Sequence, residues 1–166
     1  MSLAPALAIL LFALCTLPAA AQECRDDIPA STPAERFVLL RDGTLVDRHN
    51  GLRWQRCAVG QHWNGTGCSG EAAMLTRAGA AHHSGNGWRL PTLQELGSIV
   101  ELRCRQPAID LTLFPNAPAG NFWSATPFAN LGDDGPRYWQ VQFIYGEGNL
   151  GGLSELAFVR LMKKAD

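Results

Sequence analysis

Residues 88–95 read Trp-Arg-Leu-Pro-Thr-Leu-Gln-Glu, and this stretch decides how the centre of the chain folds. Thr92 and Glu95 have the spacing of a capping box, in which the two side chains satisfy the first backbone N–H groups of a helix. Apolar residues then follow with the period of one helix face, namely Leu93, Leu96, Ile99, Val100 and Cys104. We therefore predict a helix from residue 92 to residue 104 that packs on a sheet and places Cys104 inward.

The residues before this helix have β character. Residues 36–57 contain three short strand-like segments separated by the turn pairs Asp42-Gly43 and Asn50-Gly51, and the last segment, 52–57, alternates apolar and polar side chains. We expect a β-meander here. Residues 71–83 are rich in alanine and predict a short second helix.

Strands are also expected after the helix. A proline-containing loop at 105–121 leads into predicted strands at 121–126, 137–145 and 157–162. In the second of these strands one alternate set is apolar and is expected to face the core: Trp139, Val141, Phe143 and Tyr145. A meander, two helices and further strands predict an α+β fold.

The N-terminal segment predicts export. Residues 2–21 carry no charged side chain, their apolar core is Leu7 to Leu14, and three alanines precede Gln22. This pattern is typical of a signal peptide with a small-residue cleavage site, since the apolar run is shorter than a membrane-spanning helix requires. We expect residues 1–21 to be a signal peptide and 22–166 to form one domain, periplasmic or extracellular, without a membrane span after cleavage.

Removal of that leader leaves four cysteines, which are Cys24, Cys57, Cys68 and Cys104. An even number in an exported chain favours two disulfides, for which three pairings exist. Cys57 and Cys68 flank a compact loop rich in glycine and asparagine, so we pair them, and Cys24 with Cys104 follows by elimination. No Cys-x-x-Cys pair is present, and we expect no metal site at the cysteines.

Composition narrows the class of protein. The chain is 46% hydrophobic and 17% charged, which suits a folded domain with a real core. Its formal net charge of -1 argues against a general nucleic-acid binder, and no nucleic-acid partner is expected.

Arginine is unevenly distributed along the chain. Residues 36–105 contain nine arginines and five acidic residues, which leaves a local positive surplus. Arginine suits bidentate contact with sulfate or carboxylate, although ordinary surface charge explains the same surplus. Trp63 lies in the polar loop between two cysteines, whereas the other four tryptophans have core periodicity. The candidate ligand-binding residues are Arg48, Arg53, Arg56, Trp63 and Arg77.

Three patterns associated with other chemistry are weak in this chain. Gly146 to Gly151 matches Gly-x-Gly-x-x-Gly, but too few residues follow for a dinucleotide fold, so we interpret it as a turn. His82 and His83 are adjacent and point apart on a helix, and no Gly-x-Ser-x-Gly elbow is present. The turn with Asp133 and Asp134 offers oxygen ligands for calcium, with an acidic surface turn as the alternative.

Several separated motifs carry a family resemblance. They are GLRWQRCAVGQHWNGTGCSG at 51–70, WRLPTLQELGSIVE at 88–101, AIDLTLFPNAP at 108–118, FWSATP at 122–127, YWQVQF at 138–143 and VRLMK at 159–163. In this order they resemble the Lcl C-terminal domain family and the wider C-type-lectin-like group. The resemblance implies a helix packed against a small twisted sheet. The family's best-described member binds sulfated glycosaminoglycans through a charged surface on a trimer, which implies a similar role here.

These observations give a ranked functional expectation. The first is an exported, non-catalytic binding module without a cofactor, which recognises a glycan (including sulfated glycosaminoglycan) or a surface protein. The alternative is a structural cell-envelope or pilus-associated component that contacts only proteins. An enzyme ranks third, and the oligomeric state is left open, a homo-oligomer included.

Overall fold

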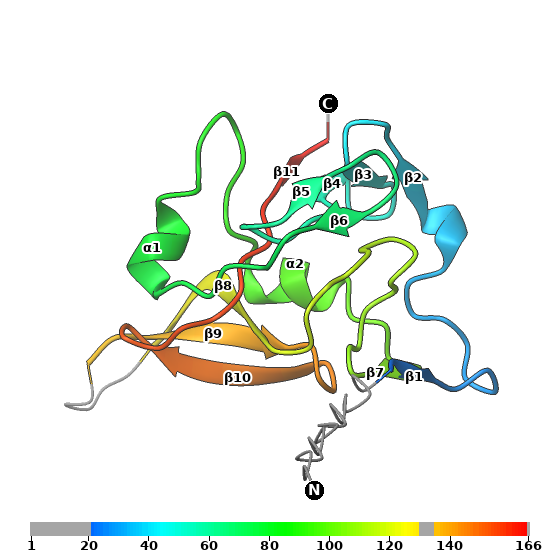
Figure 1. Ribbon diagram of the computed structural model, residues 1–166. Helices are drawn as coiled ribbons and strands as arrows, with labels where there is room; N and C mark the ends of the chain where they lie inside the picture. Colours follow the sequence, from blue (N-terminus) through cyan, green and yellow to red (C-terminus); the bar gives the residue numbers. More distant parts are fainter. Residues whose placement is uncertain (1–20, 130–134, 166) are drawn as a thin grey trace, which may run out of the picture.

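The chain folds into small antiparallel sheets with two short helices beside them, as the computed structural model in Figure 1 shows. The structure describes residues 21–129 and 135–165. The predicted signal peptide, apart from Ala21, and the calcium candidates Asp133 and Asp134 lie outside these ranges.

The first sheet, called here the upper sheet, contains the predicted meander. Its strands have the order β11-β4-β3-β2 and are β2 (Phe37–Leu39), β3 (Thr44–Asp47), β4 (Leu52–Gln55) and β11 (Met162–Lys164). Leu45 and Trp54 face each other across β3 and β4, and both are fully buried. The prediction of strands in 36–57 is confirmed, and the end of the chain adds a fourth strand next to β4.

The second sheet, called here the lower sheet, comes from the C-terminal half. Its strands have the order β10-β9-β8 and are β8 (Asn121–Phe128), β9 (Arg137–Gln142) and β10 (Glu147–Gly152). Only Gly146 of the Gly146 to Gly151 segment lies in a turn, because Glu147 to Gly151 belong to β10 and pair with β9; the interpretation of the whole segment as a turn is wrong.

One expectation about β9 is wrong. Tyr145 is 53% exposed instead of facing the core, because β9 ends at Gln142 and the chain turns at Gly146. Val141 and Phe143 are buried as expected, but so is Gln140 on the opposite face. Both faces of the lower sheet are therefore covered at its centre.

Helix α2 (Leu93–Gly97) lies between the two sheets and begins with the predicted capping box. The Glu95 N–H donates to Thr92 Oγ1 at 3.2 Å, and the Thr92 N–H donates to Glu95 Oε2 at 2.7 Å. Leu96 and Ile99 are fully buried in the core that joins both sheets.

The expected length of this helix was wrong, since it ends at Gly97 and does not reach Cys104. The backbone N–H of Glu101 instead donates to the carbonyl of Ala108 at 3.1 Å. Cys104 lies in β7 (Cys104–Arg105), which pairs with β1 (Glu23–Cys24) in a two-stranded sheet. Bonds to segments distant in sequence thus replace the last turns of the predicted helix.

The other helix is also shorter than predicted. Helix α1 is Arg77–Ala81, with Thr76 as its N-cap, and does not extend over 71–83. Leu75 and Ala157 exchange two backbone hydrogen bonds of 2.9 and 3.0 Å. These tertiary bonds hold the residues before Thr76 in an extended conformation.

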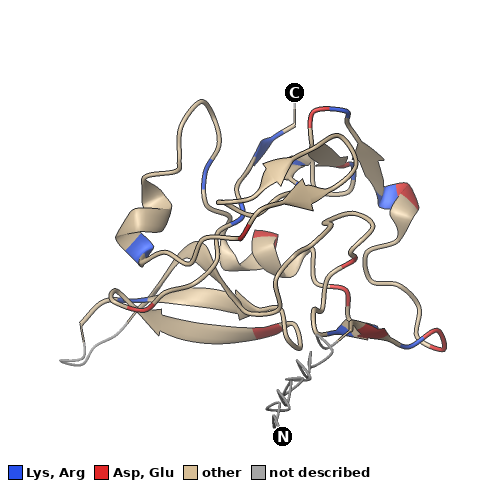
Figure 2. Cartoon of the chain, viewed as in Figure 1, with Lys and Arg blue, Asp and Glu red and all other residues tan. Residues whose placement is uncertain are grey.

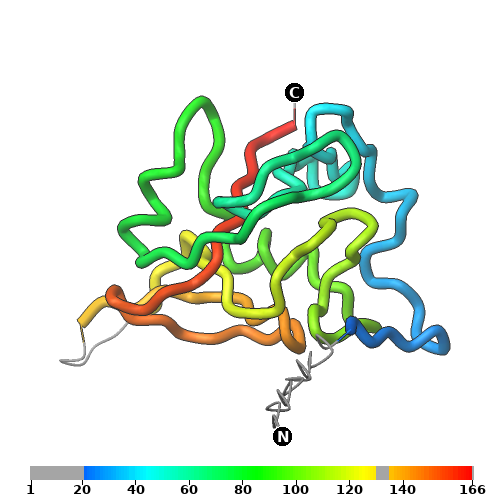
Figure 3. The backbone as a smooth tube through the Cα atoms, viewed as in Figure 1, coloured from blue at the N-terminus to red at the C-terminus, as the bar shows by residue number. Residues whose placement is uncertain are grey.

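The segment predicted as the last strand runs between the two sheets before entering β11. Figure 3 shows this segment passing from the lower sheet to the upper sheet. Phe158 exchanges backbone hydrogen bonds with Asn121 (2.8 Å) and Trp123 (3.0 Å) of β8, and Val159 accepts one from Val59. The strand itself is confined to Met162–Lys164, because the residues before it bond to three different segments.

The two disulfides have the expected pairing. Cys24 and Cys104 are directly opposite each other across β1 and β7. Cys57 and Cys68 close the loop that carries a second two-stranded sheet, β5 (His62–Trp63) and β6 (Cys68–Ser69). A short 3-10 helix, Ala34–Arg36, follows the N-terminal arm.

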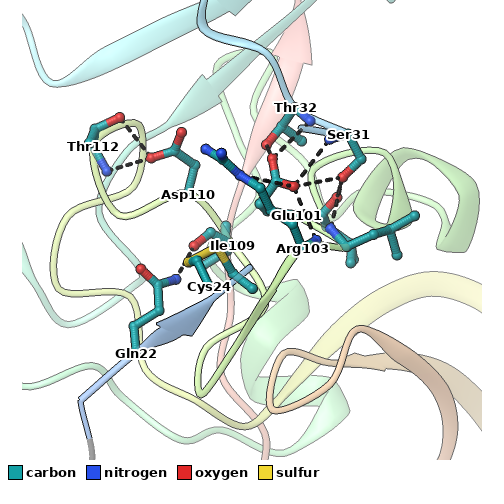
Figure 4. A network of polar contacts seen from close by, with 12 residues as sticks. Gln22, Cys24, Ser31, Thr32, Glu101, Arg103, Ile109, Asp110 and Thr112 are labelled. Carbon is teal, nitrogen blue, oxygen red and sulfur yellow. Dashed lines mark hydrogen bonds and ion pairs between the residues drawn. A yellow bond between two sulfur atoms is a disulfide. The ribbon is translucent and has the colours of Figure 1, made fainter. Parts of the chain in front are cut away.

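A buried carboxylate also fixes the N-terminal arm, as Figure 4 shows. Glu101 is 1% exposed and accepts hydrogen bonds from the backbone N–H groups of Ser31 (3.1 Å) and Thr32 (3.0 Å). The Gln22 amide donates to the carbonyls of Pro107 (2.7 Å) and Ile109 (2.6 Å). The arm is therefore attached at both ends.

Candidate functional site

An open groove of about 600 Å³ lies on the outer face of the upper sheet. Its lining comes from the start of β3, the end of β4, the disulfide loop with β5, and the loop after α1. Two indoles and two imidazoles take part in this lining, from Trp63, Trp88, His62 and His83.

The first wall of the groove is the disulfide loop with Trp63. The indole N–H of Trp63 donates to the carbonyl of Arg41 at 3.2 Å, and the Arg56 guanidinium lies 4.4 Å from the ring centre. Gly43 has a φ of +78°, and a Cβ there would lie 2.4 Å from Cγ of Trp63. The turn at Gly43 is thus matched to the indole, which fixes the wall to the sheet.

The second wall is the loop after α1, which ends in Trp88. Gly85 and Trp88 exchange backbone hydrogen bonds of 2.9 Å, while Asn86 and Gly87 adopt positive φ angles of 52° and 82° between them. This tight turn presents the half-buried Trp88 to the groove. The Lys163 ammonium of β11 lies 5.5 Å from the centre of the indole ring.

Several polar groups of the groove have no hydrogen-bond partner among the described residues. They are the amide of Gln55, the imidazoles of His62 and His83, and the indole N–H of Trp88. Amides, imidazoles and indoles together supply both donors and acceptors. The groove therefore combines aromatic surface with polar groups that are available to a ligand.

The carboxylate of Asp42, in contrast, is already engaged. It accepts hydrogen bonds from the Thr44 hydroxyl (2.6 Å) and backbone N–H (3.1 Å), and it forms an ion pair with Arg53. The hydrogen bond from the Thr44 hydroxyl is the main cause that holds the pKa of Asp42 below its usual value, and Arg53 contributes. The edge of the groove is thus close to electrically neutral.

The structure does not bring the five predicted ligand residues together. Arg53 lies at the edge of the groove, and Arg56 is buried beneath Trp63, where it donates to the carbonyls of Leu113 and Thr112 at 2.8 Å. Arg48 lines a separate hollow with Arg36 and His49. Arg77 lies on α1, with its guanidinium 4.3 Å from the ring centre of Tyr138.

Five of the nine arginines in 36–105 form an ion pair with an acidic side chain. Figure 2 shows lysines and arginines distributed over several sides of the molecule, many beside acidic residues. The ion pairs within residues 21–129 and 135–165 include Arg25–Asp27, Arg36–Asp47, Arg53–Asp42, Arg89–Glu95, Arg103–Glu101 and Arg105–Glu23. The positive surplus in 36–105 consequently does not form a single basic face.

Sequence reasoning found only part of this groove. It selected Trp63, but it assigned core periodicity to Trp88 and treated His83 only as one of two adjacent histidines that point apart. The usable signal lay in the Ser-Gly-Asn-Gly turn at 84–87, which folds the chain back and presents Trp88. No sequence pattern marked Gln55 as a groove residue, because the residues that line the groove with it are remote in sequence.

Two further properties bear on the class of protein. Within residues 21–129 and 135–165, no group of three or more His, Cys, Asp or Glu side chains is placed to hold a metal ion. In the same part of the chain, no helix has the length and apolarity needed to cross a membrane.

Comparison with known proteins gives one match. Residues 43–163 match the family model described as the Lcl C-terminal domain. This range contains the lower sheet, strands β3 and β4 of the upper sheet and most of β11, both helices, and every residue of the groove except Asp42. No curated protein and no solved structure matches the chain.

Proposed function

Because the chain belongs to the Lcl C-terminal domain family, we propose that it is an exported, non-catalytic binding module whose groove recognises a glycan. We further propose that its arrangement of sheets and helices is C-type-lectin-like. Two disulfides support a location outside the cytoplasm, because such bonds persist in oxidising compartments. The periplasm and the extracellular space are both consistent with the proposal.

One observation carries the proposal, namely the lining of the groove. Trp63 and Trp88 supply apolar ring surface, while Gln55, His62 and His83 supply unpartnered polar groups. A sugar ring has the matching chemistry, since its C–H face is apolar and its edge carries hydroxyls. Binding sites for small molecules commonly combine apolar walls with a few polar groups in this way.

The distribution of charge favours a ligand held by stacking and hydrogen bonds over one held by a basic surface. The arginine at the groove is paired with Asp42, and the buried Arg56 is occupied by backbone carbonyls. A sulfated glycosaminoglycan therefore ranks below other glycans as a partner. Salt concentration separates these classes, because binding to a polyanion weakens steeply as salt is added.

A glycan array with the purified mature domain tests the proposal. The matched variants are Trp88→Ala, in the groove, and Tyr145→Ala, an aromatic side chain 53% exposed outside the groove. We expect Trp88→Ala to lower the affinity for the bound glycan by about tenfold, or about 1.4 kcal/mol, and Tyr145→Ala to leave it unchanged. A blank array, or equal loss in both variants, contradicts the proposal.

A second candidate function is a structural envelope protein that contacts only other proteins. Met74, Leu153 and Leu156 are 50%, 49% and 54% exposed. Leu75 and Ala157 form an isolated antiparallel bridge, and side-chain alternation places the adjacent Met74 and Leu156 on the side opposite to Leu75 and Ala157. Cross-linking in the envelope fraction tests this candidate. If the protein contacts only other proteins, the double variant Met74→Ser with Leu156→Ser should no longer give the cross-linked species. The glycan array should then be blank for the wild type as well.

A further inference from the structure

We propose that the groove takes a saccharide that bears a carboxylate, and that His62 and His83 strengthen its binding as the pH falls from about 7.5 to about 5.5. This inference rests on the proposed function, because it specifies the ligand class and the pH response of the same groove.

The positions of the two histidines carry the argument. His62 belongs to β5 on the disulfide loop, and His83 follows α1, so the two imidazoles come from opposite walls. Both residues are exposed, and neither ring has a hydrogen-bond partner among the described residues. A ligand in the groove therefore meets two imidazoles that no described side chain occupies.

The charged groups around the groove leave few acidic competitors for these imidazoles. Asp42 is the acidic side chain in the lining, and Arg53 already pairs with it. A Cβ at Gly70 would lie 4.0 Å from Cδ2 of His62, and Glu71 follows Gly70 in the chain, but Glu71 does not line the groove.

Two further cations lie behind the aromatic walls. The Arg56 guanidinium stacks on Trp63, and the Lys163 ammonium lies over Trp88. Protonation of the two imidazoles would therefore add positive charge in front of walls that already have a cation behind them.

The ligand class follows from this added positive charge. Imidazoles gain a proton between about pH 8 and pH 5, whereas a sugar carboxylate stays ionised over that range. A protonated imidazole donates from both ring nitrogens, and a hydrogen bond from a charged donor to a carboxylate is stronger than one between neutral groups. A neutral saccharide gains nothing comparable from the added charge. Acid should thus strengthen the binding of acidic sugars selectively.

The test is calorimetric titration at constant ionic strength, at pH 5.5, 6.5 and 7.5. The probes are the trimers of galacturonic, glucuronic and mannuronic acid, each beside its carboxyl-reduced neutral counterpart. We expect at least one acidic trimer to bind roughly tenfold more tightly at pH 5.5 than at pH 7.5, since two exposed charge pairs add this much. The neutral counterparts should show no such change.

Histidine variants locate the effect. His62→Gln combined with His83→Gln should abolish the pH dependence, while His82→Gln, next to His83 but outside the groove lining, should retain it. Equal melting temperatures of the variants show that the fold is unchanged. If the groove binds acidic and neutral trimers equally at every pH, or if His82→Gln alone removes the effect, this inference is overturned and the glycan groove remains. If no trimer binds and the array is blank, both proposals are overturned.

Discussion

The Thr32 hydroxyl donates a hydrogen bond of 2.6 Å to Oε2 of Glu101, 69 positions further along the chain. Ser31 donates to the other oxygen of the same carboxylate through its backbone N–H, and Arg103 lies 3.8 Å from it. A single buried carboxylate thus fixes the N-terminal arm to the turn after α2.

This carboxylate makes stability depend on pH in the acidic range. Burial by itself raises the pKa of Glu101, but the hydrogen bonds from Thr32 and Ser31 together lower it below its usual value. A carboxyl with a lower pKa in the folded state stabilises the fold above its unfolded pKa of about 4.3, and this contribution is lost as the pH falls through the folded pKa. We therefore expect the urea midpoint to fall between pH 5 and pH 3.

The variant Glu101→Gln isolates this group. It should be about 2 kcal/mol less stable than the wild type at pH 7, because an uncharged amide accepts these hydrogen bonds less strongly. Its midpoint should then change less between pH 5 and pH 3 than that of the wild type. An equally steep decline in the variant would assign the pH dependence to other carboxyls, such as Asp47.

The glycines of β10 allow a matched packing test. A Cβ at Gly151 would lie 2.1 Å from Nε2 of Gln140 and 2.7 Å from Cη2 of Trp123, both fully buried. Gly148, in the same strand, has its nearest such contact at an ordinary 3.7 Å, to Trp139. We expect Gly151→Ala to cost about 1–3 kcal/mol in urea denaturation and Gly148→Ala to be close to neutral. Equal effects would mean that the centre of the lower sheet repacks freely.

Arg160 is a buried cation that has no acidic partner among the residues that the structure describes. It is fully buried between Phe114 and Phe122, it donates to the carbonyl of Gln55 at 3.0 Å, and burial lowers its pKa to about 9. The pKa of Arg160 is lower in the folded state, so above pH 9 the unfolded state binds more protons than the folded state. The contribution of this group to the free energy of unfolding therefore increases as the pH rises above 9.

Two substitutions separate the charge of Arg160 from its volume. Arg160→Met keeps most of the volume and removes the desolvated charge, so we expect a stability within about 2 kcal/mol of the wild type. Arg160→Ala leaves a cavity beside two phenylalanines and should cost about 3–5 kcal/mol. Chemical denaturation at pH 7 measures both. A methionine variant as unstable as the alanine variant would show that the hydrogen bonds to backbone carbonyls dominate.

The two disulfides should differ in what their removal changes. The sequence separation of 11 between Cys57 and Cys68 predicts a loss of about 3 kcal/mol when this disulfide is removed, and the separation of 80 between Cys24 and Cys104 predicts about 4.5 kcal/mol. Only the Cys57–Cys68 bond holds a wall of the groove. We therefore expect the double variant Cys57→Ser with Cys68→Ser to lose glycan affinity, and Cys24→Ser with Cys104→Ser to keep it. Loss of affinity at both pairs, measured at a temperature where each variant is folded, would contradict this assignment.

Local signals predicted the starts of elements better than their ends. The capping box at Thr92 and Glu95 and the turn at Asp42-Gly43 act within a few residues, and the structure contains both. The ends of the two helices depend on partners such as Ala108 and Ala157, which are distant in sequence. Periodicity alone does not contain that information.

The candidate site shows the same limit. Trp63 stood out because it lies between two cysteines, but the arginines chosen beside it were selected by type and local count. Their actual partners, Asp42 for Arg53 and the Leu113 carbonyl for Arg56, decide which of them meet solvent. The second wall, with Trp88, becomes visible only when the chain is folded.

The attachment of the N-terminal arm at β1 and β7 also means that the N-terminus and the groove lie at different ends of the domain. In Figure 1, β1 lies at the end of the molecule opposite to β5 and β11, whose residues border the groove. A fusion protein or sensor surface joined through residue 22 would leave the groove facing the bulk solution, whereas one joined after Lys164 would crowd Trp88. The choice of terminus for immobilisation therefore determines whether a weak ligand is detected.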